Sequence, residues 1–162
     1  MRGSLDSSSD AVWSWDYDAA ANKLTNQKTL VTGMDQEGHS SRTILISAKH
    51  PELLYVSRGS SGNIDTIAAD PASGRSTIKA YNITSVPDGG YDQASQGAMV
   101  AYGARNEVGI VEDAAGVLWG VENSADEVVR VINGVRTDVH TNNPAEKLHS
   151  CEYDVEGDDE DS

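Results

Sequence analysis

The sequence predicts an all-β fold and, within that class, part of a β-propeller. Apolar or alternating runs of four to seven residues recur along the chain, and no apolar period of 3.6 residues lasts for more than two helical turns. In addition, one strand unit occurs twice, and its leading glycines, Gly38 and Gly103, are 65 residues apart. A strand unit that recurs at a long period is typical of propellers and repeat arrays.

Each copy of this unit begins with a glycine-led polar turn that runs into an apolar strand. The first copy is Gly38-His39-Ser40-Ser41-Arg42-Thr43 with a later strand at 53–57, and the second is Gly103-Ala104-Arg105-Asn106-Glu107-Val108 with a later strand at 117–121. Equivalent ends of the inner strands meet at the central channel of a propeller. We therefore expect the polar residues of the two turns to lie close together.

The predicted strands divide into blades along the chain. Residues 12–32 give two outer strands of one blade, residues 42–102 a complete four-stranded blade, and residues 107–132 three strands of another. Propellers need about four to eight blades. The strands of this chain amount to about two and a half blades. The chain is therefore expected to form an incomplete ring with two exposed sheet edges.

Local patterns place the individual elements. Residues 12–17 alternate and are aromatic, which favours a strand, whereas glycine and serine fill 58–63 and indicate a loop. Pro87, Gly89 and Gly90 interrupt a long loop at 83–97. The strands are expected at 12–17, 27–32, 43–47, 53–57, 76–82, 98–102, 108–111, 117–121 and 128–132, with a helical turn within 64–74 and a tight turn at Asn133-Gly134.

Composition divides the chain into three segments and excludes some partners. Residues 1–10 are rich in Ser and Asp and are expected to be flexible, residues 11–148 form the propeller part, and residues 149–162 form an acidic disordered tail. The net charge of −14 disfavours nucleic acids and anionic membranes as partners. One cysteine, Cys151, excludes an internal disulfide and a cysteine-rich zinc site.

Two further absences bear on location. No apolar run approaches the roughly 20 residues that a membrane span needs. The N-terminal residues Met1–Asp6 contain no apolar signal segment, so either the chain is not exported or the sequence is truncated, and its localisation stays open. Taken on residue type alone, His39 is a hydrogen-bonded histidine in a polar turn, and Arg105 with Asn106 is a solvated surface turn.

Five motifs in order support a more specific interpretation. Together they resemble the fungal pyrroloquinoline quinone (PQQ)-dependent pyranose dehydrogenases, which are similar to bacterial soluble glucose dehydrogenase and to sorbosone dehydrogenases. The resemblance runs from about Val12 to Leu148 and implies a six-bladed propeller, of which this chain would be the second to fourth blades in part. The motifs are Gly38-His39-Ser40-Ser41-Arg42-Thr43, Val56-Ser57-Arg58-Gly59-Ser60-Ser61-Gly62-Asn63-Ile64-Asp65, Arg105-Asn106-Glu107-Val108-Gly109, Val121-Glu122-Asn123-Ser124-Ala125-Asp126 and His140-Thr141-Asn142-Asn143-Pro144-Ala145-Glu146.

The resemblance implies a reaction and roles for three residues. The family removes a hydride from a sugar carbon and delivers it to PQQ, while the sugar hydroxyl loses a proton. His39 would be the general base, because a neutral imidazole suits that proton transfer. Arg105 would stabilise negative charge on a quinone oxygen, and Asn106 would donate to the cofactor or orient Arg105.

Further residues would hold the cofactor and its calcium ion. Arg42 and Arg58 are secondary candidates for binding the PQQ carboxylates, although Arg42 also suits bracing of the His39 turn and Arg58 a structural salt bridge. The resemblance implies calcium ligands among the backbone carbonyls of Ser124 and Ala125, since calcium commonly takes carbonyl oxygens. On residue type alone the same loop is an acidic solvated turn.

The expected function is therefore that of a fragment of a PQQ-dependent pyranose dehydrogenase, with a pyranose sugar and an electron acceptor as partners. The fragment alone is expected to be inactive, and another chain that completes the propeller would be a partner. The family is secreted. Two other functions remain open: a non-catalytic propeller binding module, and a calcium-dependent lactonase-like hydrolase that would use Asn106, Glu122 and Asn123 as ligands.

Overall fold

The computed structural model of the protein describes residues 2–8, 10–34, 38–139 and 146–151. These residues form β-strands and two short 3-10 helices, with no α-helix among them, so the predicted all-β fold class is confirmed. In chain order the elements are β1 (Arg2–Ser7), β2 (Val12–Asp18), β3 (Lys23–Thr32), β4 (Ile44–Ile46), β5 (Leu53–Arg58), η1 (Ile67–Ala69), η2 (Pro71–Ser73), β6 (Thr77–Asn82), β7 (Tyr91–Asp92), β8 (Ala98–Tyr102), β9 (Glu107–Glu112), β10 (Leu118–Glu122), β11 (Val129–Ile132), β12 (Val135–Asp138) and β13 (Lys147–Cys151).

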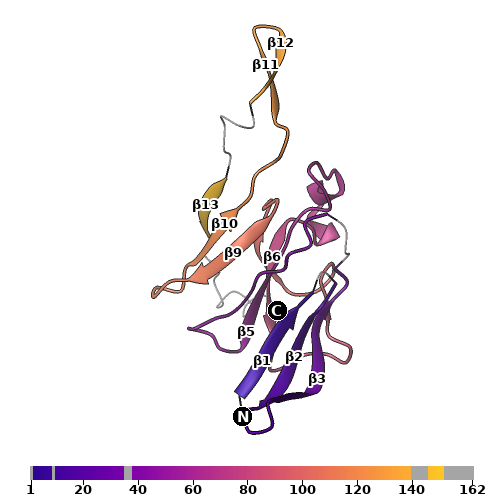
Figure 1. The fold of residues 1–162 in the computed structure, drawn as a ribbon, viewed down its shortest axis with the longest axis vertical. Helices are drawn as coiled ribbons and strands as arrows, with labels where there is room; N and C mark the ends of the chain where they lie inside the picture. Colours follow the sequence, from indigo (N-terminus) through magenta and orange to yellow (C-terminus); the bar gives the residue numbers. More distant parts are fainter. Residues whose placement is uncertain (1, 9, 35–37, 140–145, 152–162) are drawn as a thin grey trace, which may run out of the picture.

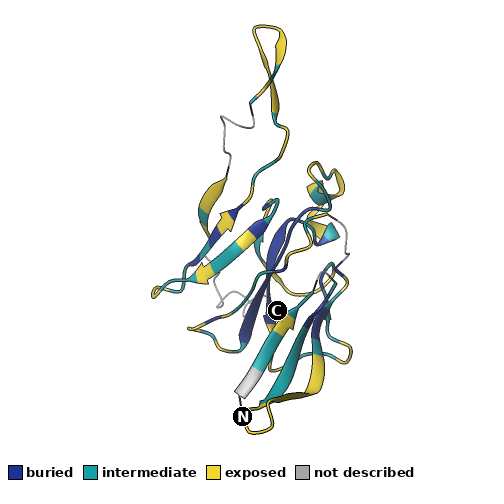
Figure 2. Cartoon of the chain, in the orientation of Figure 1, coloured by how far each residue is buried: buried dark blue, intermediate teal, exposed yellow. Residues whose placement is uncertain are grey.

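The second sheet, in the order β4-β5-β6-β8, is the complete four-stranded blade predicted for residues 42–102. All its pairings are antiparallel. All six residues of β5 are buried, as are the first five of β6. Figure 2 shows these two strands as the most buried part of the molecule. The two central strands of this blade are therefore covered on both faces.

The first sheet, in the order β1-β2-β3-β7, contains a strand that the sequence did not predict. Residues 1–10 were expected to be flexible, but Arg2–Ser7 pairs antiparallel with β2 over six residue pairs. A strand next to the alternating β2 gains its backbone hydrogen bonds whatever its own side chains are, so a Ser- and Asp-rich segment can fill the place. Ser7 Oγ also donates to the Arg42 carbonyl at 3.0 Å, which ties β1 to the second blade.

The third sheet, in the order β13-β10-β9, has a different third strand from the one predicted. Residues 128–132 were assigned to it, but β11 pairs with β12 in a separate hairpin around Asn133-Gly134. Both turn residues have positive φ, 51° and 81°, as a tight hairpin turn requires. The third strand is β13, which pairs with β10 and includes residues 149–151 of the expected disordered tail.

Other parts of those predictions lie outside the described residues. They are the motif at 140–145 and the acidic residues 152–162. Within the described part of the chain, no helix is long and apolar enough to cross a membrane.

Two apolar layers hold the three sheets face to face. Figure 1 shows the sheets side by side, with the β11–β12 hairpin projecting beyond them. This stacking, with the apolar sides of neighbouring sheets in contact, is the way blades pack in a propeller. The layer between the first and second sheets contains Val12, Leu30, Val31, Met34, Leu54, Val56 and Tyr81; the layer between the second and third contains Tyr55, Ile78, Ala80 and Leu118.

Candidate functional site

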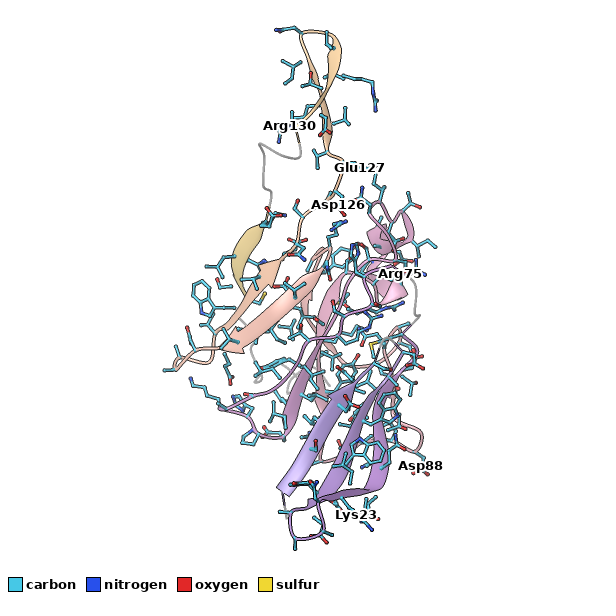
Figure 3. All side chains as sticks on the ribbon, in the orientation of Figure 1. Lys23, Arg75, Asp88, Asp126, Glu127 and Arg130 are labelled. Atoms are coloured by element: carbon cyan, nitrogen blue, oxygen red, sulfur yellow. The ribbon has the colours of Figure 1, made fainter. Side chains whose placement is uncertain are left out.

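Loops from the second and third sheets meet at one end of the stack, and we call this place the loop junction. It consists of residues 38–42, 59–65, 103–106 and 122–126. Backbone hydrogen bonds join them in series: His39 N donates to Ser60 O at 3.1 Å, Ser60 N to Arg105 O at 2.8 Å, and Asn123 N to Asn106 O at 2.9 Å. Figure 3 shows Arg75 and Asp126 toward this end of the sheets and Lys23 at the opposite end. The two glycine-led turns of the repeat therefore lie side by side, as the repeat predicts.

A glycine allows the close approach of the two turns. A Cβ atom at Gly59 would lie 2.7 Å from Arg105 O and 2.9 Å from His39 Cβ. Real Cβ contacts essentially never fall below 3.0 Å. Any side chain at this position would therefore push the His39 turn away from the Arg105 turn.

The hydrogen bonds of His39 determine which ring nitrogen carries the proton. Nδ1 lies 2.9 Å from Ser60 O and 3.0 Å from Ser60 Oγ. The carbonyl oxygen can only accept, and the Ser60 hydroxyl already donates to Gly62 O at 2.8 Å, so both contacts require a proton on Nδ1. In the neutral imidazole, Nε2 then carries the free lone pair. His39 is thus held in the tautomer that can accept a proton at Nε2.

Two arginines predicted to bind cofactor make bracing contacts. Arg42 is buried, and its Nη1 donates to His39 O at 2.7 Å and to Ser41 O at 2.8 Å, which fixes the backbone of the His39 turn. Arg58 is also buried, and its Nη1 donates to Ser73 O at 3.2 Å. Arg58 follows Val56 by two residues in β5, so it lies on the same face of the strand, which packs toward the first sheet. A cofactor contact for either arginine stays a prediction.

The guanidinium group of Arg105 is surrounded by protein oxygens. Nε donates to Asn63 O at 3.4 Å, Nη1 to Asn123 O at 3.3 Å and to Ser124 O, and Nη2 to Asn63 Oδ1 at 2.8 Å and Asp126 Oδ2 at 3.2 Å. A guanidinium has five N–H donors, and these contacts engage all of them. The Arg105 side chain is 13% exposed, whereas that of Asp126 is 80% exposed.

One of the two predicted calcium ligands is therefore already bound by another group. Ser124 O accepts a hydrogen bond from Arg105, so this carbonyl faces a cation of the protein itself. Ala125 lies beside it and lines a hollow of about 380 Å³ together with Asn63 and Asp126. Among the residues that the structure describes, no group of three or more His, Cys, Asp or Glu side chains could hold a metal ion. In this conformation the oxygens of the 122–126 loop bind the Arg105 guanidinium.

Asn106, expected to contact the cofactor or orient Arg105, is half-buried beside both turns. Its Oδ1 accepts from Ser41 Oγ at 3.4 Å, and its backbone carbonyl accepts from Asn123 N. The side-chain NH₂ group is the donor that these contacts do not use. Asn106 therefore connects the loops of two blades, and a cofactor contact through its NH₂ group stays a prediction.

Two residues of the loop junction had no predicted role. Asn63 binds the Arg105 guanidinium and also Asp126, and Ser60 binds the His39 ring. Both belong to the 56–65 motif, but a polar residue in a glycine-rich loop gives no sign of its partner. That motif position was the only available signal.

Asp65 anchors the loop that carries them. It accepts from Ser61 N at 2.7 Å and pairs with Arg75 at 3.2 Å. Burial alone would raise the pKa of Asp65, but the hydrogen bond from Ser61 and the charge of Arg75 hold it below its usual value. The ionised carboxylate of Asp65 therefore stabilises the 59–65 loop.

A pair of buried carboxylates lies behind the junction, on the side of the third sheet that faces the second. Burial, together with the nearby Glu122, raises the pKa of Glu107 to about 7. Glu107 Oε2 lies 3.3 Å from His149 Nε2, and Glu122 Oε2 lies 3.8 Å from Lys147 Nζ. Glu122, proposed above as a metal ligand of a hydrolase, also accepts a hydrogen bond from the Arg105 backbone N–H at 2.5 Å. These contacts thus hold the Glu122 carboxylate in the interior of the protein.

The stacked sheets, with polar loops joined at one end of the inner strands, define a β-propeller that carries a loop-built site. The chain belongs to the TrAA12-like family, whose sequence profile matches residues 5–161. The partial propeller predicted from the sequence is confirmed by its structural neighbours.

Curated relatives come from two fungi. The chain is 48% identical over 145 residues to the PQQ-dependent pyranose dehydrogenase of Coprinopsis cinerea and 38% identical over 143 residues to the PQQ-dependent sugar dehydrogenase of Hypocrea jecorina. These alignments cover 89% and 85% of this chain. They cover only 20% and 32% of the two relatives, so the chain spans a fifth to a third of their length.

Solved structures agree with this assignment. The holo form of the PQQ domain of the Coprinopsis cinerea pyranose dehydrogenase matches with a TM-score of 0.85 and 47% identity, over 91% of this chain and 36% of that one. The calcium structure of the Trichoderma reesei family AA12 enzyme matches with a TM-score of 0.81 and 36% identity, over 90% of this chain and 36% of that one.

Proposed function

We propose that this chain is part of a PQQ-dependent pyranose dehydrogenase that oxidises a sugar by hydride transfer, with His39 as the general base. The names of the relatives support the sugar and the cofactor. The observation that carries the role of His39 is the pair of contacts from Nδ1 to Ser60, which leave Nε2 as the basic nitrogen. The activity belongs to the whole propeller, of which this chain is a part.

The chemistry needs a base and a fixed geometry. When bound, PQQ would supply the acceptor for the hydride that leaves the sugar carbon. His39 Nε2 accepts the proton of the hydroxyl on the same carbon, so a C–H and an O–H bond are lost and a carbonyl forms. Ser60 keeps the ring oriented, and Arg42 fixes the backbone that carries it. General base catalysis of this kind contributes about 10²- to 10⁴-fold in rate.

The described residues fit the cofactor in part. His39 and the Asn106 amide have a lone pair and a donor available for a ligand. Arg105 would stabilise negative charge on a quinone oxygen, but it first has to exchange one of its present partners, and the exposed Asp126 is the easiest to give up. Calcium binding through the carbonyls of Ser124 and Ala125 is likewise a proposal, one that requires the guanidinium to move.

This chain alone is expected to bind PQQ weakly and to turn over little or no sugar, because another chain or further blades must complete the ring and its cationic groups. The test is a titration of the chain with PQQ in the presence of calcium, followed by sugar and a one-electron acceptor. We expect weak, calcium-dependent PQQ binding that His39→Ala or Arg105→Gln weakens further. Tight stoichiometric binding with sugar turnover contradicts the inactive fragment, and an absence of calcium-dependent binding contradicts the proposed function.

A non-catalytic binding module is the second candidate, and one observation favours it: every N–H donor of Arg105 already has a protein acceptor. Replacement of His39 by Ala separates the two candidates. If the completed propeller oxidises sugar, the His39→Ala variant loses that activity. If the chain is part of a binding module, the variant keeps its binding function. The hydrolase alternative is disfavoured, since Glu122 points into the interior.

A further inference from the structure

We propose that in the ligand-free protein the Arg105 guanidinium occupies the place of a cation among the oxygens of the 122–126 loop, and that Asn63 is the positioning residue that holds it there. The guanidinium and a metal cation would then compete for the same oxygens. This inference rests on the proposed function in one respect, since it takes calcium as the competing ion.

The first support is the chemistry of the oxygens around the guanidinium. They are three backbone carbonyls, one side-chain amide oxygen and one carboxylate oxygen. These are the ligand types that calcium takes. In this structure each accepts an N–H of Arg105, and the five are Asn63 O, Asn63 Oδ1, Asn123 O, Ser124 O and Asp126 Oδ2.

The second support is the double contact that Asn63 makes with the loop of the next blade. Its Nδ2 donates to Asp126 O at 2.8 Å, and Asp126 N donates to its Oδ1 at 2.7 Å. The same Oδ1 accepts from Arg105 Nη2 at 2.8 Å. One side chain thus ties together the loop of the second blade, the loop of the third blade and the guanidinium.

The third support is the rigidity of the segment that presents Asn63. Asp65 accepts from the backbone N–H groups of Ser61, Ile67 and Ala68 and pairs with Arg75, whose side chain is 18% exposed. These contacts hold both ends of the short segment that contains Asn63. The position of the amide is therefore set by the fold and not by the ligand.

The guanidinium and a calcium ion exclude each other by simple electrostatics. Calcium lies about 2.3–2.6 Å from a ligand oxygen and an N–H donor about 2.9 Å from its acceptor, so an ion on Ser124 O would lie within about 5.5 Å of Arg105 Nη1. Like charges at that distance in a partly buried place repel strongly. Occupation of the loop by calcium thus requires Arg105 to leave, and removal of Arg105 favours calcium.

The test is calcium titration by calorimetry in the absence of PQQ, at constant ionic strength. We expect Arg105→Gln to bind calcium at least about tenfold more tightly than the unmodified protein. The matched control is Arg136→Gln, because Arg136 lines the same hollow as Asn63 and Asp126 and carries the same charge. It should change calcium affinity by less than about threefold, through screened long-range charge alone.

A second measurement uses the unmodified protein and so does not depend on how a variant folds. The Arg105 Nε–H signal in a ¹H–¹⁵N spectrum should be protected from exchange without calcium and lose that protection as calcium is added. Asn63→Ala should weaken this protection without calcium, because it removes Oδ1, the acceptor of Nη2, and leaves Nε only its 3.4 Å contact with the backbone carbonyl of residue 63. Asn82→Ala should not weaken it, because Asn82 is at the other end of the same sheet.

Two results overturn the inference: calcium affinity in Arg105→Gln that is equal to or weaker than in Arg136→Gln, and an Arg105 signal that stays protected at calcium saturation. Absence of measurable calcium binding in every variant also overturns it, since no competition then exists. The proposed function is judged separately, by PQQ binding in the titration described above. A protein that binds PQQ with calcium but shows no Arg105 effect retains the function and loses this inference.

Discussion

A single ring nitrogen decides whether His39 can act as a base. Its Nδ1 faces two oxygens of Ser60, one of which can only accept. We therefore expect the neutral imidazole to be protonated at Nδ1 in the ligand-free chain. Imidazole ¹⁵N chemical shifts at mildly alkaline pH distinguish the two tautomers. A spectrum with the proton on Nε2 contradicts both the assigned geometry and the proposed role.

The serine hydroxyl should matter less than the serine carbonyl in holding this ring. Ser60→Ala removes Oγ and its bond to Gly62 but keeps the backbone acceptor. We expect the Nδ1–H tautomer to persist, with a loss of about 1 kcal/mol in the free energy of unfolding. Urea unfolding and the same ¹⁵N spectrum measure the two effects. Loss of the tautomer in Ser60→Ala means that the hydroxyl, and not the carbonyl, fixes the ring.

Gly59 offers a direct test of how closely the two turns must approach. Gly59→Ala places a methyl group 2.7 Å from Arg105 O and 2.9 Å from His39 Cβ, so the turns must separate. We expect a destabilisation of about 1–3 kcal/mol by overpacking, measured by urea unfolding. Gly62→Ala is the matched control from the same loop, since its Cβ would meet nothing closer than 3.9 Å. Equal stabilities for the two variants would show that the turns are free to move apart.

At the scale of elements, the third sheet contains a pH-dependent contribution to stability. The folded protein raises the pKa of Glu107 from 4.5 to about 7, through burial and the nearby Glu122. The folded state therefore holds this proton over a range in which the unfolded chain has lost it. Stability from Glu107 is fully present below about pH 4.5 and is lost as the pH rises through about 7.

Glu107→Gln should remove this dependence, because the amide keeps nearly the same shape and never ionises. Between about pH 5 and about pH 8 we expect the variant to lose less stability than the unmodified protein and to be the more stable of the two at the alkaline end. Glu127→Gln is the control, an exposed glutamate of the same charge. The other ionisable groups around Glu107 are His149, Glu122, Lys147 and Cys151. Parallel pH curves for wild type and Glu107→Gln would contradict the assignment.

The elements also show which structural features a sequence reveals. The central blade was predicted because its strands alternate and are flanked by glycine-rich turns, which are local signals. β1 and β13 were missed because their sequences are largely polar and lack apolar alternation, and because β13 also pairs with a strand that is distant in the chain. The strand at 129–132 was found, but its partner was wrong, because apolar alternation does not specify which edge a strand joins.

The loop junction, too, could be predicted from the sequence only in part. The closeness of the His39 and Arg105 turns could be predicted from the repeat, since equivalent turns of neighbouring blades adjoin. The contacts of Ser60 and Asn63 could not, because both are small polar residues whose partners lie on other loops. The competition for Ser124 O was equally hidden: sequence identifies a carbonyl but not what it faces.

The molecule as a whole ends its stack of sheets on an uncovered apolar face. On the side of the third sheet away from the second, Val111 is 59% exposed, Val121 44% and Leu148 68%. Together with Trp119 they line a hollow of about 200 Å³. In a complete ring this face would be covered by the next blade. Among the described residues this face is exposed; an apolar patch of this kind favours association with another copy, and the net charge of −14 on each copy opposes it.

We therefore expect self-association that grows with protein concentration and with salt, because salt screens the repulsion while leaving the apolar attraction. Leu148→Lys should weaken it at high salt, since it places a charge in the centre of the exposed face. Val135→Lys is the matched control, the same kind of change at a residue 64% exposed on the β11–β12 hairpin. Sedimentation velocity at low and high salt measures the effect. If both variants associate like the unmodified chain, the third sheet is not the contact. If salt disperses the associated form, charge and not apolar surface drives the association.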